Sequence, residues 1–355
     1  MMARAMLPCL CGFALALSAC RDNAPVGFVG HLSGPASELS IAGRDGAKLF
    51  VEQEGFRLVS CDSRGSPAGA AACVRALADS GAKVVIGPMI SGVVDSAIAA
   101  ANSVGALLVS PTVSSHLLIG LDDPFLRMIG SNLDQADTLA ALMRHGGFRH
   151  PLVLWERKNA VYTEAVARRV LLKSGVSSDS FPAFSWGYTT GLDLSFDSLV
   201  LAHPEVDAFV LSGSAMDAGL LCRAVARGGS KAKLFGSQFA MGSDLLRVGG
   251  AAAEGVVIAA AAPLADSTPL RRTFLTLFEQ RFRHPPAFSA HFGWEAAVAS
   301  RPGWSQPDAR RAKAAILAQA RVAPLGDTLV MDRFGDTRRK VVPHVVRSGR
   351  FEVLR

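Results

Sequence analysis

Residues 84–115 read VVIGPMISGVVDSAIAAANSVGALLVSPTVSS and contain the unit that decides the fold. Residues 84–86 and 107–109 are short apolar runs, and residues 92–104 between them have the apolar spacing of a helix. A strand, a helix and a second strand in this order predict a βαβ unit with parallel strands. Continuously apolar strands are typical of parallel sheets that are buried on both faces.

The same alternation of strands and helices continues on both sides of this unit. We expect further strands over residues 26–29, 58–61, 126–129, 152–155, 209–211, 234–235 and 256–261. We expect further helices over residues 37–54, 67–80, 134–144, 162–174, 216–227 and 243–248. This order predicts an α/β protein whose parallel sheets are covered by helices on both faces.

The order of elements changes after Pro269. Three helices are expected in succession over residues 269–283, 289–300 and 308–320, followed by strands over 328–331, 341–346 and 351–354. A chain of 355 residues exceeds what one compact core usually serves, so we expect two lobes. Because no long linker separates them, we expect the chain to cross between the lobes several times.

The first 19 residues are expected to be a secretory signal and not part of the fold. Arg4 is their only charge, and the apolar residues 6–17 are too few to span a membrane stably as a helix. The run Leu17-Ser18-Ala19-Cys20 resembles the lipobox of bacterial lipoproteins, which implies lipidation of Cys20 and a membrane anchor. An ordinary signal peptide with a chance cysteine at its end is the alternative.

Basic residues outnumber acidic ones, with 37 Lys and Arg against 30 Asp and Glu. They form scattered pairs such as Arg168-Arg169 and Arg271-Arg272, and they do not gather on one aromatic-rich face. This distribution favours solvated helix faces and gives no indication of nucleic-acid binding. A composition of 50% hydrophobic and 19% charged residues indicates a globular protein with a substantial core.

Three cysteines follow Cys20 in the sequence: Cys61, Cys73 and Cys222. Export of the chain permits disulfides. Cys61 ends a predicted strand and Cys73 lies in the next helix, so a local bridge between them is geometrically conceivable. Two buried free thiols are the alternative, and Cys222 is expected to be an unpaired core residue.

No catalytic or metal-binding motif stands out. The sequence has no Gly-x-Ser-x-Gly elbow, no Walker loop and no His-Glu-x-x-His pattern. His145 and His150 flank a Gly146-Gly147 turn, which is a weak indication of a metal pair. We therefore expect no enzyme activity, no cofactor and no metal.

Candidate binding residues follow the predicted strands, because open parallel sheets bind ligands at the carboxyl ends of their strands. Small and polar residues follow three of these strands, over 30–35, 87–92 and 110–115. A helix start offers unpaired N–H groups, which makes Ser91 and Gly92 a candidate anion seat. A purely structural N-cap role for Ser91 explains the residue equally well.

Several segments, taken in order, resemble the type I periplasmic binding proteins, in particular the Leu/Ile/Val-binding receptors of ABC importers. They are residues 27–35, 43–47, 84–92, 108–114, 153–156, 213–227, 235–238, 253–256 and 293–297. The resemblance implies two doubly wound lobes joined by three crossovers, expected near Gly130, Ala260 and Gly326. The first lobe then comprises residues 20–130 and 261–326, and the second comprises 131–260 and 327–355.

The resemblance also implies a set of binding residues. Amino-acid receptors of this family hold the ligand carboxylate on one lobe, a role that passes here to Ser91, Gly92, Thr112, Val113 and Ser114. The ligand ammonium usually meets an acidic residue, in whose place this chain has Gln238. The remaining implied residues are small or aliphatic where relatives are often aromatic, or lie beside such a position: Ala160, Tyr162, Ser214 and Leu39.

These differences lead to a hypothesis about the ligand. A glutamine accepts a hydrogen bond from an ammonium group but cannot offset its charge, and an unpaired buried charge is costly. We expect a small carboxylate-bearing or amino-acid-like ligand that is not a plain α-amino acid in the usual pose. Arg157 and Lys158 would favour a second anionic group, unless they simply face solvent.

The resemblance implies an exported solute receptor that closes on its ligand about a hinge and delivers it to an ABC permease. A ligand-sensing or envelope-docking lipoprotein of the same fold is the alternative. Arg21 beside Cys20 would permit transfer of a Gram-negative lipoprotein to the outer membrane, whereas Asp22 makes that signal ambiguous. The ligand, the permease, the membrane and the oligomeric state stay open.

Overall fold

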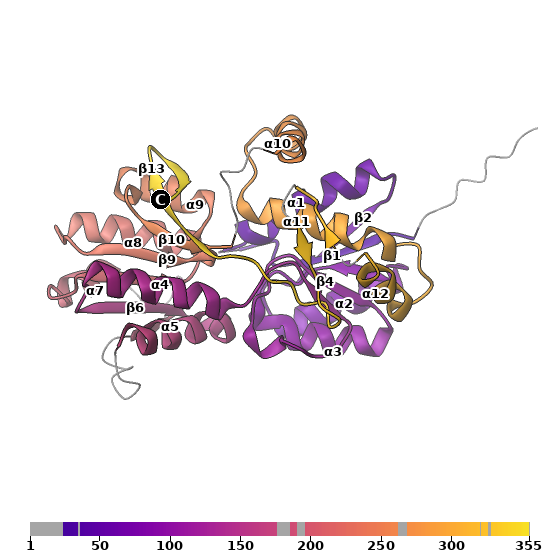
Figure 1. Cartoon of the computed structure of the whole chain (residues 1–355), viewed down its shortest axis with the longest axis horizontal. Coiled ribbons are helices and arrows are strands. Elements are labelled where there is room, and N and C mark those ends of the chain that lie inside the picture. The colour runs from indigo at the N-terminus through magenta and orange to yellow at the C-terminus, as the bar shows by residue number, and fades with distance from the viewer. Residues whose placement is uncertain are drawn as a thin grey trace, which may run out of the picture.

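The computed structural model of the protein describes residues 24–34, 36–175, 185–189, 196–261, 268–319, 321–325 and 328–354. The expected signal segment 1–19 and the expected lipidation site Cys20 lie outside these ranges. The described residues form two α/β lobes that lie side by side along the long axis (Figure 1). None of the described helices is long and apolar enough to cross a membrane.

The first lobe is built on a parallel sheet with the strand order β2-β1-β3-β4-β5. Its strands are β1 (Val26–Gly30), β2 (Leu58–Asp62), β3 (Val84–Ile86), β4 (Leu107–Ser110) and β5 (Phe125–Arg127). Every residue of β1, β3 and β4 is buried, as strands covered on both faces require. In this doubly wound order the strand sequence reverses between β1 and β3, which is where such sheets bind ligands.

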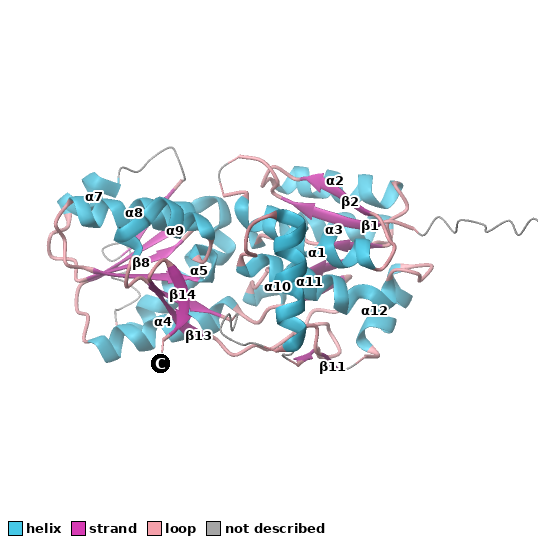
Figure 2. Cartoon of the chain, turned by 90° about the horizontal axis from the view of Figure 1, so that it is seen from above, coloured by secondary structure: helices cyan, strands magenta, loops and turns pink. Residues whose placement is uncertain are grey.

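Helices cover both faces of the first sheet (Figure 2). The helices are α1 (Glu38–Gln53), α2 (Pro67–Asp79), α3 (Val94–Val104), α10 (Pro269–Phe282), α11 (Phe288–Ser300) and α12 (Ala309–Leu317). Buried residues of α2 and α3 pack on one face, whereas α1, α11 and α12 pack on the other. The last three helices of the chain therefore complete the lobe that the first hundred residues begin.

The second lobe repeats the same strand order and extends it. Its strands are β6 (Pro151–Glu156), β7 (Ser185–Tyr188), β8 (Ala208–Ser212), β9 (Lys233–Ser237), β10 (Val257–Ala260), β13 (Val342–Arg347) and β14 (Arg350–Val353). They run in the order β7-β6-β8-β9-β10-β13-β14. Strands β6 to β10 are parallel, and β13 and β14 add an antiparallel hairpin at the β10 edge.

Helices also cover both faces of the second sheet (Figure 1). They are α4 (Asn132–Gly146), α5 (Ala160–Ser174), α7 (Phe196–Ala202), α8 (Ala215–Arg227) and α9 (Ser243–Gly249). Helices α4 and α5 form one apolar layer with the sheet, and α7, α8 and α9 form the other. Each lobe therefore has its own core.

The expected fold class of two doubly wound α/β lobes is confirmed, with local differences. The strand expected over 126–129 ends at Arg127, so Met128 and Ile129 belong to the connection into the second lobe. Strand β7 and helix α7 were not predicted. The hairpin β13–β14 makes the second sheet mixed, because its short strands lie at an edge and pair with a neighbour that runs the other way.

The chain crosses between the lobes at three places. It crosses between β5 and α4, and again between β10 and α10. A third crossover is expected near Gly326, which lies outside the described residues. Beyond it, Leu329 still packs in the core of the first lobe and Asp336 pairs with Arg127 at 2.7 Å. The strands β11 (Arg321–Val322) and β12 (Leu329–Val330) form a pair that lies with the first lobe, and Thr337 forms a β-bridge with Met331 just after this pair. The last crossover therefore follows Thr337.

Close packing of α1 against α11 explains the glycines in two segments of the resemblance, 43–47 and 293–297. A Cβ atom at Gly46 would lie 1.9 Å from the carbonyl oxygen of Ala290, and one at Gly293 would lie 1.9 Å from that of Gly43. No side chain fits at either position, so the helices approach backbone to backbone. The segments 43–47 and 293–297 thus serve the packing of the first lobe and not ligand contact.

Cys61 and Cys73 form a disulfide between β2 and α2, with an S–S distance of 2.05 Å. The bridge links positions 12 residues apart at one edge of the first sheet. Cys222 is a buried free thiol in the core of the second lobe, and burial raises its pKa to about 12.

Removing this disulfide destabilises the first lobe. A bridge that closes a loop of this length restricts the unfolded chain by about 3 kcal/mol. We expect the double variant Cys61→Ser/Cys73→Ser to lose about that much free energy of unfolding in chemical denaturation. The wild type in reductant should show the same loss, and an unchanged midpoint in both would contradict the role of the bridge.

Candidate functional site

A cavity lies between the lobes, where loops that follow the strands of both sheets meet. We call it the inner cavity. It is lined by Leu39, Met89, Ile90, Ser91, Thr112, Ser114, Ile129, Gln135, Asn159, Tyr162, Gln238, Phe239 and Phe288. Its volume of about 30 Å³ has room for about two water molecules, so the lobes are closed on each other.

None of the residues that line the inner cavity is acidic or basic. The polar lining consists of hydroxyl and amide groups, and the remainder is aliphatic, aromatic or methionine. Within the described ranges, no group of three or more His, Cys, Asp or Glu side chains is placed to hold a metal ion. The chemistry of this cavity is therefore hydrogen bonding and apolar contact, without a formal charge.

Hydroxyl groups of the first lobe form one wall of the inner cavity. The Thr112 hydroxyl donates to a backbone carbonyl oxygen at 2.6 Å. The hydroxyls of Ser91 and Ser114 make no hydrogen bond with any described residue. Val113 does not line the cavity, because its side chain lies in the apolar core and its N–H donates to Ser110 Oγ at 3.0 Å.

The opposite wall is a hydrogen-bonded group from the second lobe. The Tyr162 hydroxyl donates to Gln135 Oε1 at 2.6 Å, and the N–H of Gln238 donates to the same oxygen at 3.1 Å. Burial raises the pKa of Tyr162, so it remains a donor. Gln238 Oε1 accepts from the N–H of Ala261 at 3.0 Å, while its Nε2 is buried without a partner among the described residues. On this wall the side-chain amide oxygens of Gln135 and Gln238 are therefore already hydrogen-bonded, whereas Gln238 Nε2 is still available as a donor.

The candidate anion seat of the first lobe is occupied by a side chain of the second. Ser91 begins the short helix η1 (Ser91–Val93), and its side chain forms no capping bond, so the N-cap interpretation is wrong. The N–H of Gly92 donates to Asn159 Oδ1 at 2.8 Å across the cleft. Asn159 ends the short helix η3 (Arg157–Asn159) of the second lobe. Its amide oxygen therefore takes an N–H group that the resemblance assigns to the ligand carboxylate.

A further contact joins the lobes at the rim of the cleft. Glu38 Oε1 accepts from both the N–H and the hydroxyl of Ser243, each at 2.6 Å, and Oε2 accepts from the N–H of Asp244 at 3.3 Å. Ser243 and Asp244 begin α9, so a carboxylate of the first lobe lies at the N-terminus of a helix in the second. Both contacts stabilise the closed arrangement.

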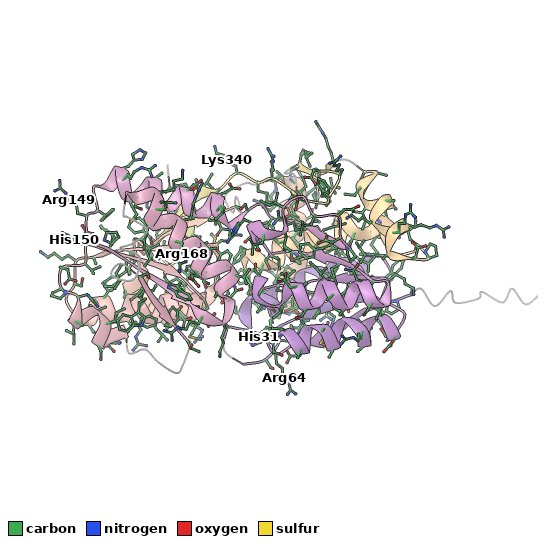
Figure 3. All side chains as sticks on the ribbon, turned by 90° about the horizontal axis from the view of Figure 1, so that it is seen from below. His31, Arg64, Arg149, His150, Arg168 and Lys340 are labelled. Atoms are coloured by element: carbon green, nitrogen blue, oxygen red, sulfur yellow. A yellow bond between two sulfur atoms is a disulfide. The ribbon has the colours of Figure 1, made fainter. Side chains whose placement is uncertain are left out.

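A larger space adjoins the inner cavity, and we call it the outer chamber. Its volume is about 430 Å³, and it is lined by His31, Ser33, Gly34, Ala36, Arg64, Gly65, Ser66, Ile90, Glu156, Lys158, Asn159, Ser214 and Phe239. Ile90, Asn159 and Phe239 line both spaces and so separate them. Figure 3 places His31 at the junction of the lobes, with Arg64 beside it on the same side of the molecule.

Electrostatic effects from both lobes act on His31. Burial is the largest effect and lowers the pKa of His31. The backbone of Ser33 and the carboxylate of Asp62 oppose it, whereas the charge of Lys158 lowers the pKa further. Lys158 belongs to the second lobe, so closure brings two basic side chains together across the cleft.

The structure brings most of the sequence-predicted residues together, but not all. Leu39, Ser91, Thr112, Ser114, Tyr162 and Gln238 line the inner cavity. Ala160 is the first residue of α5 and lines neither space. Ser214 lines the outer chamber instead, and its hydroxyl donates to Asp217 at 2.7 Å.

Sequence reasoning missed several lining residues. Gln135 lies on α4 and Phe288 begins α11, so neither directly follows a strand. Helix α4 comes immediately after a crossover, which is the signal that could have indicated Gln135, whereas α11 follows α10 and offers no such signal. Phe239 follows the candidate Gln238 directly and lines both spaces.

The family model described as "Periplasmic binding protein" matches residues 24–300 of this sequence. The chain belongs to this family. No curated protein matches the chain. Solved structures match in fold, including the leucine-binding protein LivK of Thermotoga maritima, at 19% identity and a TM-score of 0.80 over 94% of this chain and 98% of that one.

Other structures similar to this periplasmic binding protein carry different ligands. LivJ of Streptococcus pneumoniae, in complex with isoleucine, is 18% identical, with a TM-score of 0.81 over 94% of this chain and 99% of that one. A solute-binding protein of an ABC transporter from R. palustris, in complex with benzoate, is 18% identical, with a TM-score of 0.79 over 94% and 95%. At these identities the likeness shows the shared fold alone.

The Asn159–Gly92 bond should set how far this periplasmic binding protein closes without ligand. We expect Asn159→Ala to remove about 1 kcal/mol from the closed state, which is about a fivefold shift toward the open one. Small-angle X-ray scattering of the ligand-free protein should show a larger radius of gyration. Asn102→Ala, on the exposed face of α3, is the matched control. Identical scattering for wild type and Asn159→Ala would contradict the role of this bond.

Proposed function

We propose that this periplasmic binding protein captures a small carboxylate that carries no ammonium group and delivers it to an ABC importer. The observation that carries the proposal is the inner cavity, which lies between the lobes and has an uncharged lining. Capture requires the lobes to open, because the closed cavity of about 30 Å³ has no room for such a ligand.

The free polar groups of the cavity suit a carboxylate. The hydroxyls of Ser91 and Ser114 on one wall and Gln238 Nε2 on the other have no partner among the described residues. All three are hydrogen-bond donors, and hydrogen bonds from neutral donors to a carboxylate are stronger than those to a neutral acceptor. A carboxylate therefore gains bonds without requiring a buried cation.

An ammonium group does not suit the same cavity. The side-chain oxygen of Gln135 already accepts from the Tyr162 hydroxyl and the Gln238 N–H. The side-chain oxygen of Gln238 already accepts from the N–H of Ala261. No lining residue supplies a negative charge to offset an ammonium ion. Burying that ion unpaired is costly, which disfavours a zwitterionic amino acid.

The apolar lining and the similar structures support the same ligand class. Phe239, Phe288 and Ile129 lie around the polar groups and suit an aliphatic or aromatic ligand body. Among proteins of similar structure, one binds benzoate and another binds 3,4-dihydroxybenzoic acid. We extend this class of ligand to the present chain as part of the proposal.

The proposal includes attachment to the cell envelope. The lipobox-like run at Leu17-Ser18-Ala19-Cys20 supports a lipid anchor at Cys20, which keeps the receptor beside a membrane permease. An envelope-docking lipoprotein of the same fold would need no small ligand, so the ligand experiment below separates docking from ligand capture.

A thermal-shift screen of the soluble chain tests the proposal. We expect stabilisation by benzoate or hexanoate but not by leucine, since a ligand that binds only the folded state raises its stability. Ser91→Ala should weaken binding about tenfold or more by removing one donor to the carboxylate. Ser103→Ala, on the exposed face of α3, is the control. Silence across all acids would contradict the proposed capture of a carboxylate and favour the docking function.

Exchanging one amide for a carboxylate should change the ligand class. Gln238→Glu preserves shape but adds a negative charge to the uncharged cavity. We expect it to weaken benzoate or hexanoate binding at least tenfold, about 1.4 kcal/mol, and to introduce leucine binding. Isothermal titration of both ligands measures the change. Tight leucine binding by the wild type would contradict the proposed exclusion of ammonium.

A further inference from the structure

We propose that the outer chamber receives a second acid group of the captured ligand, so that this protein prefers an elongated dianion to a monocarboxylate. This inference rests on the proposed function, because it assigns the first acid group to the inner cavity. It goes beyond that function by giving a place and a chemistry to the far end of the ligand.

The two spaces adjoin, with only shared lining residues between them. Ile90, Asn159 and Phe239 line the inner cavity and the outer chamber alike. In the closed structure the outer chamber has a volume of about 430 Å³, whereas the inner cavity has a volume of about 30 Å³. On this proposal, a ligand that is held at Ser91 and is longer than the inner cavity displaces the shared lining at Phe239 and extends into the chamber.

The acidic groups at the chamber are already bonded to the protein. Glu156 accepts from the N–H groups of Lys158 and Asn159, both at 3.0 Å. Asp62 accepts from the N–H groups of Leu32 at 2.8 Å and Arg64 at 2.9 Å, and also from the Ser33 hydroxyl. These carboxylates hold the loops in place, so they are poor partners for a ligand cation.

The hydroxyl groups of the chamber are also engaged. Ser33 donates to Asp62, Ser66 donates to a backbone carbonyl at 3.2 Å, and Ser214 donates to Asp217 at 2.7 Å. The polar side chains of the chamber that are still available to a ligand are the basic ones. Lys158 and Arg64 are exposed, and neither forms an ion pair with a described residue.

These basic side chains come from opposite lobes. Lys158 lies in η3 of the second lobe, whereas His31 and Arg64 follow β1 and β2 of the first. In the closed structure Lys158 is close enough to His31 to add to the lowering of its pKa by burial, so the uncharged imidazole is favoured there. An anion in the chamber would attract Lys158 of the second lobe and Arg64 of the first, and would so favour closure. Figure 3 shows that Lys340, in the segment before β13, lies on the other side of the molecule from His31 and Arg64, so it does not contribute.

The loop that carries Lys158 is held rigidly. The carboxylate of Glu156 fixes the N–H groups of η3, and the Thr163 hydroxyl bonds the carbonyl oxygens of Glu156 at 2.6 Å and Asn159 at 3.1 Å. The backbone of Lys158 is therefore fixed in advance, which lowers the entropic cost of binding an anion there.

Matched acids of different length test the inference. The probes are the straight-chain diacids from succinate to azelate, each compared with the monocarboxylate of equal length, such as hexanoate for adipate and nonanoate for azelate. Isothermal titration of the wild type should show one of the diacids binding at least tenfold tighter than the monocarboxylate of equal length. Lys158→Gln should lose most of that advantage and bind the monocarboxylate as the wild type does. Arg64→Gln should lose a smaller part.

Lys231→Gln, an exposed lysine of the second lobe that lines neither space, is the control for the charge change. Equal affinity for monocarboxylates and diacids, or an undiminished diacid advantage in Lys158→Gln, overturns this inference while the proposed function stands. Loss of monocarboxylate and diacid binding together in Ser91→Ala supports the inner cavity as the common site. Failure of every acid to bind overturns the proposed function and this inference together.

Discussion

The parallel direction of the strands is the constraint on which the site depends. Parallel strands place all of their carboxyl ends at one edge of a sheet, so the loops that follow them gather there. In the first lobe these loops carry His31, Arg64, Ser91 and Thr112, and in the second they carry Asn159, Ser214 and Gln238. Because both lobes have this arrangement, closing them brings two polar loop edges together, and the inner cavity and the outer chamber lie between those edges.

A division of hydrogen-bonding capacity gives these edges their chemical character. Acceptor groups are used within the protein: Glu156 and Asp62 fix loops, Glu38 holds the start of α9, and the amide oxygens of Gln135 and Gln238 bond within the second lobe. Donor groups remain, uncharged in the inner cavity and cationic in the outer chamber. The same division explains why Asn159 Oδ1 bonds the N–H of Gly92, because a free donor at a closed interface needs an acceptor. A ligand carboxylate therefore competes with a bond that the protein supplies itself.

The resemblance to amino-acid receptors predicts the carboxylate side of the site better than the other side. Ser91, Thr112 and Ser114 lie on the cavity wall as expected, since each follows a strand of the first sheet. Val113, between two of them, points into the core, because successive residues in this extended loop face opposite ways. Gln238 lies in the cavity, but its role depends on Ala261 and Gln135, which bond it from other parts of the chain. No pattern within residues 235–238 reveals those bonds.

The sequence by itself determined the βαβ alternation, the two lobes and the carboxyl-edge loops, because apolar periodicity and strand-end chemistry are local properties of the chain. Only the tertiary structure decided which loop residues meet. Asn159 reaches Gly92 across 67 positions, and Glu38 reaches Ser243 across 205. Gln135 enters the site from the helix after the first crossover, and Phe288 enters it from α11, which follows α10. The last crossover itself lies beyond Asp336, because that residue pairs with the buried Arg127. Such contacts depend on how two separately packed lobes fit against each other, and that fit is not encoded in any one segment.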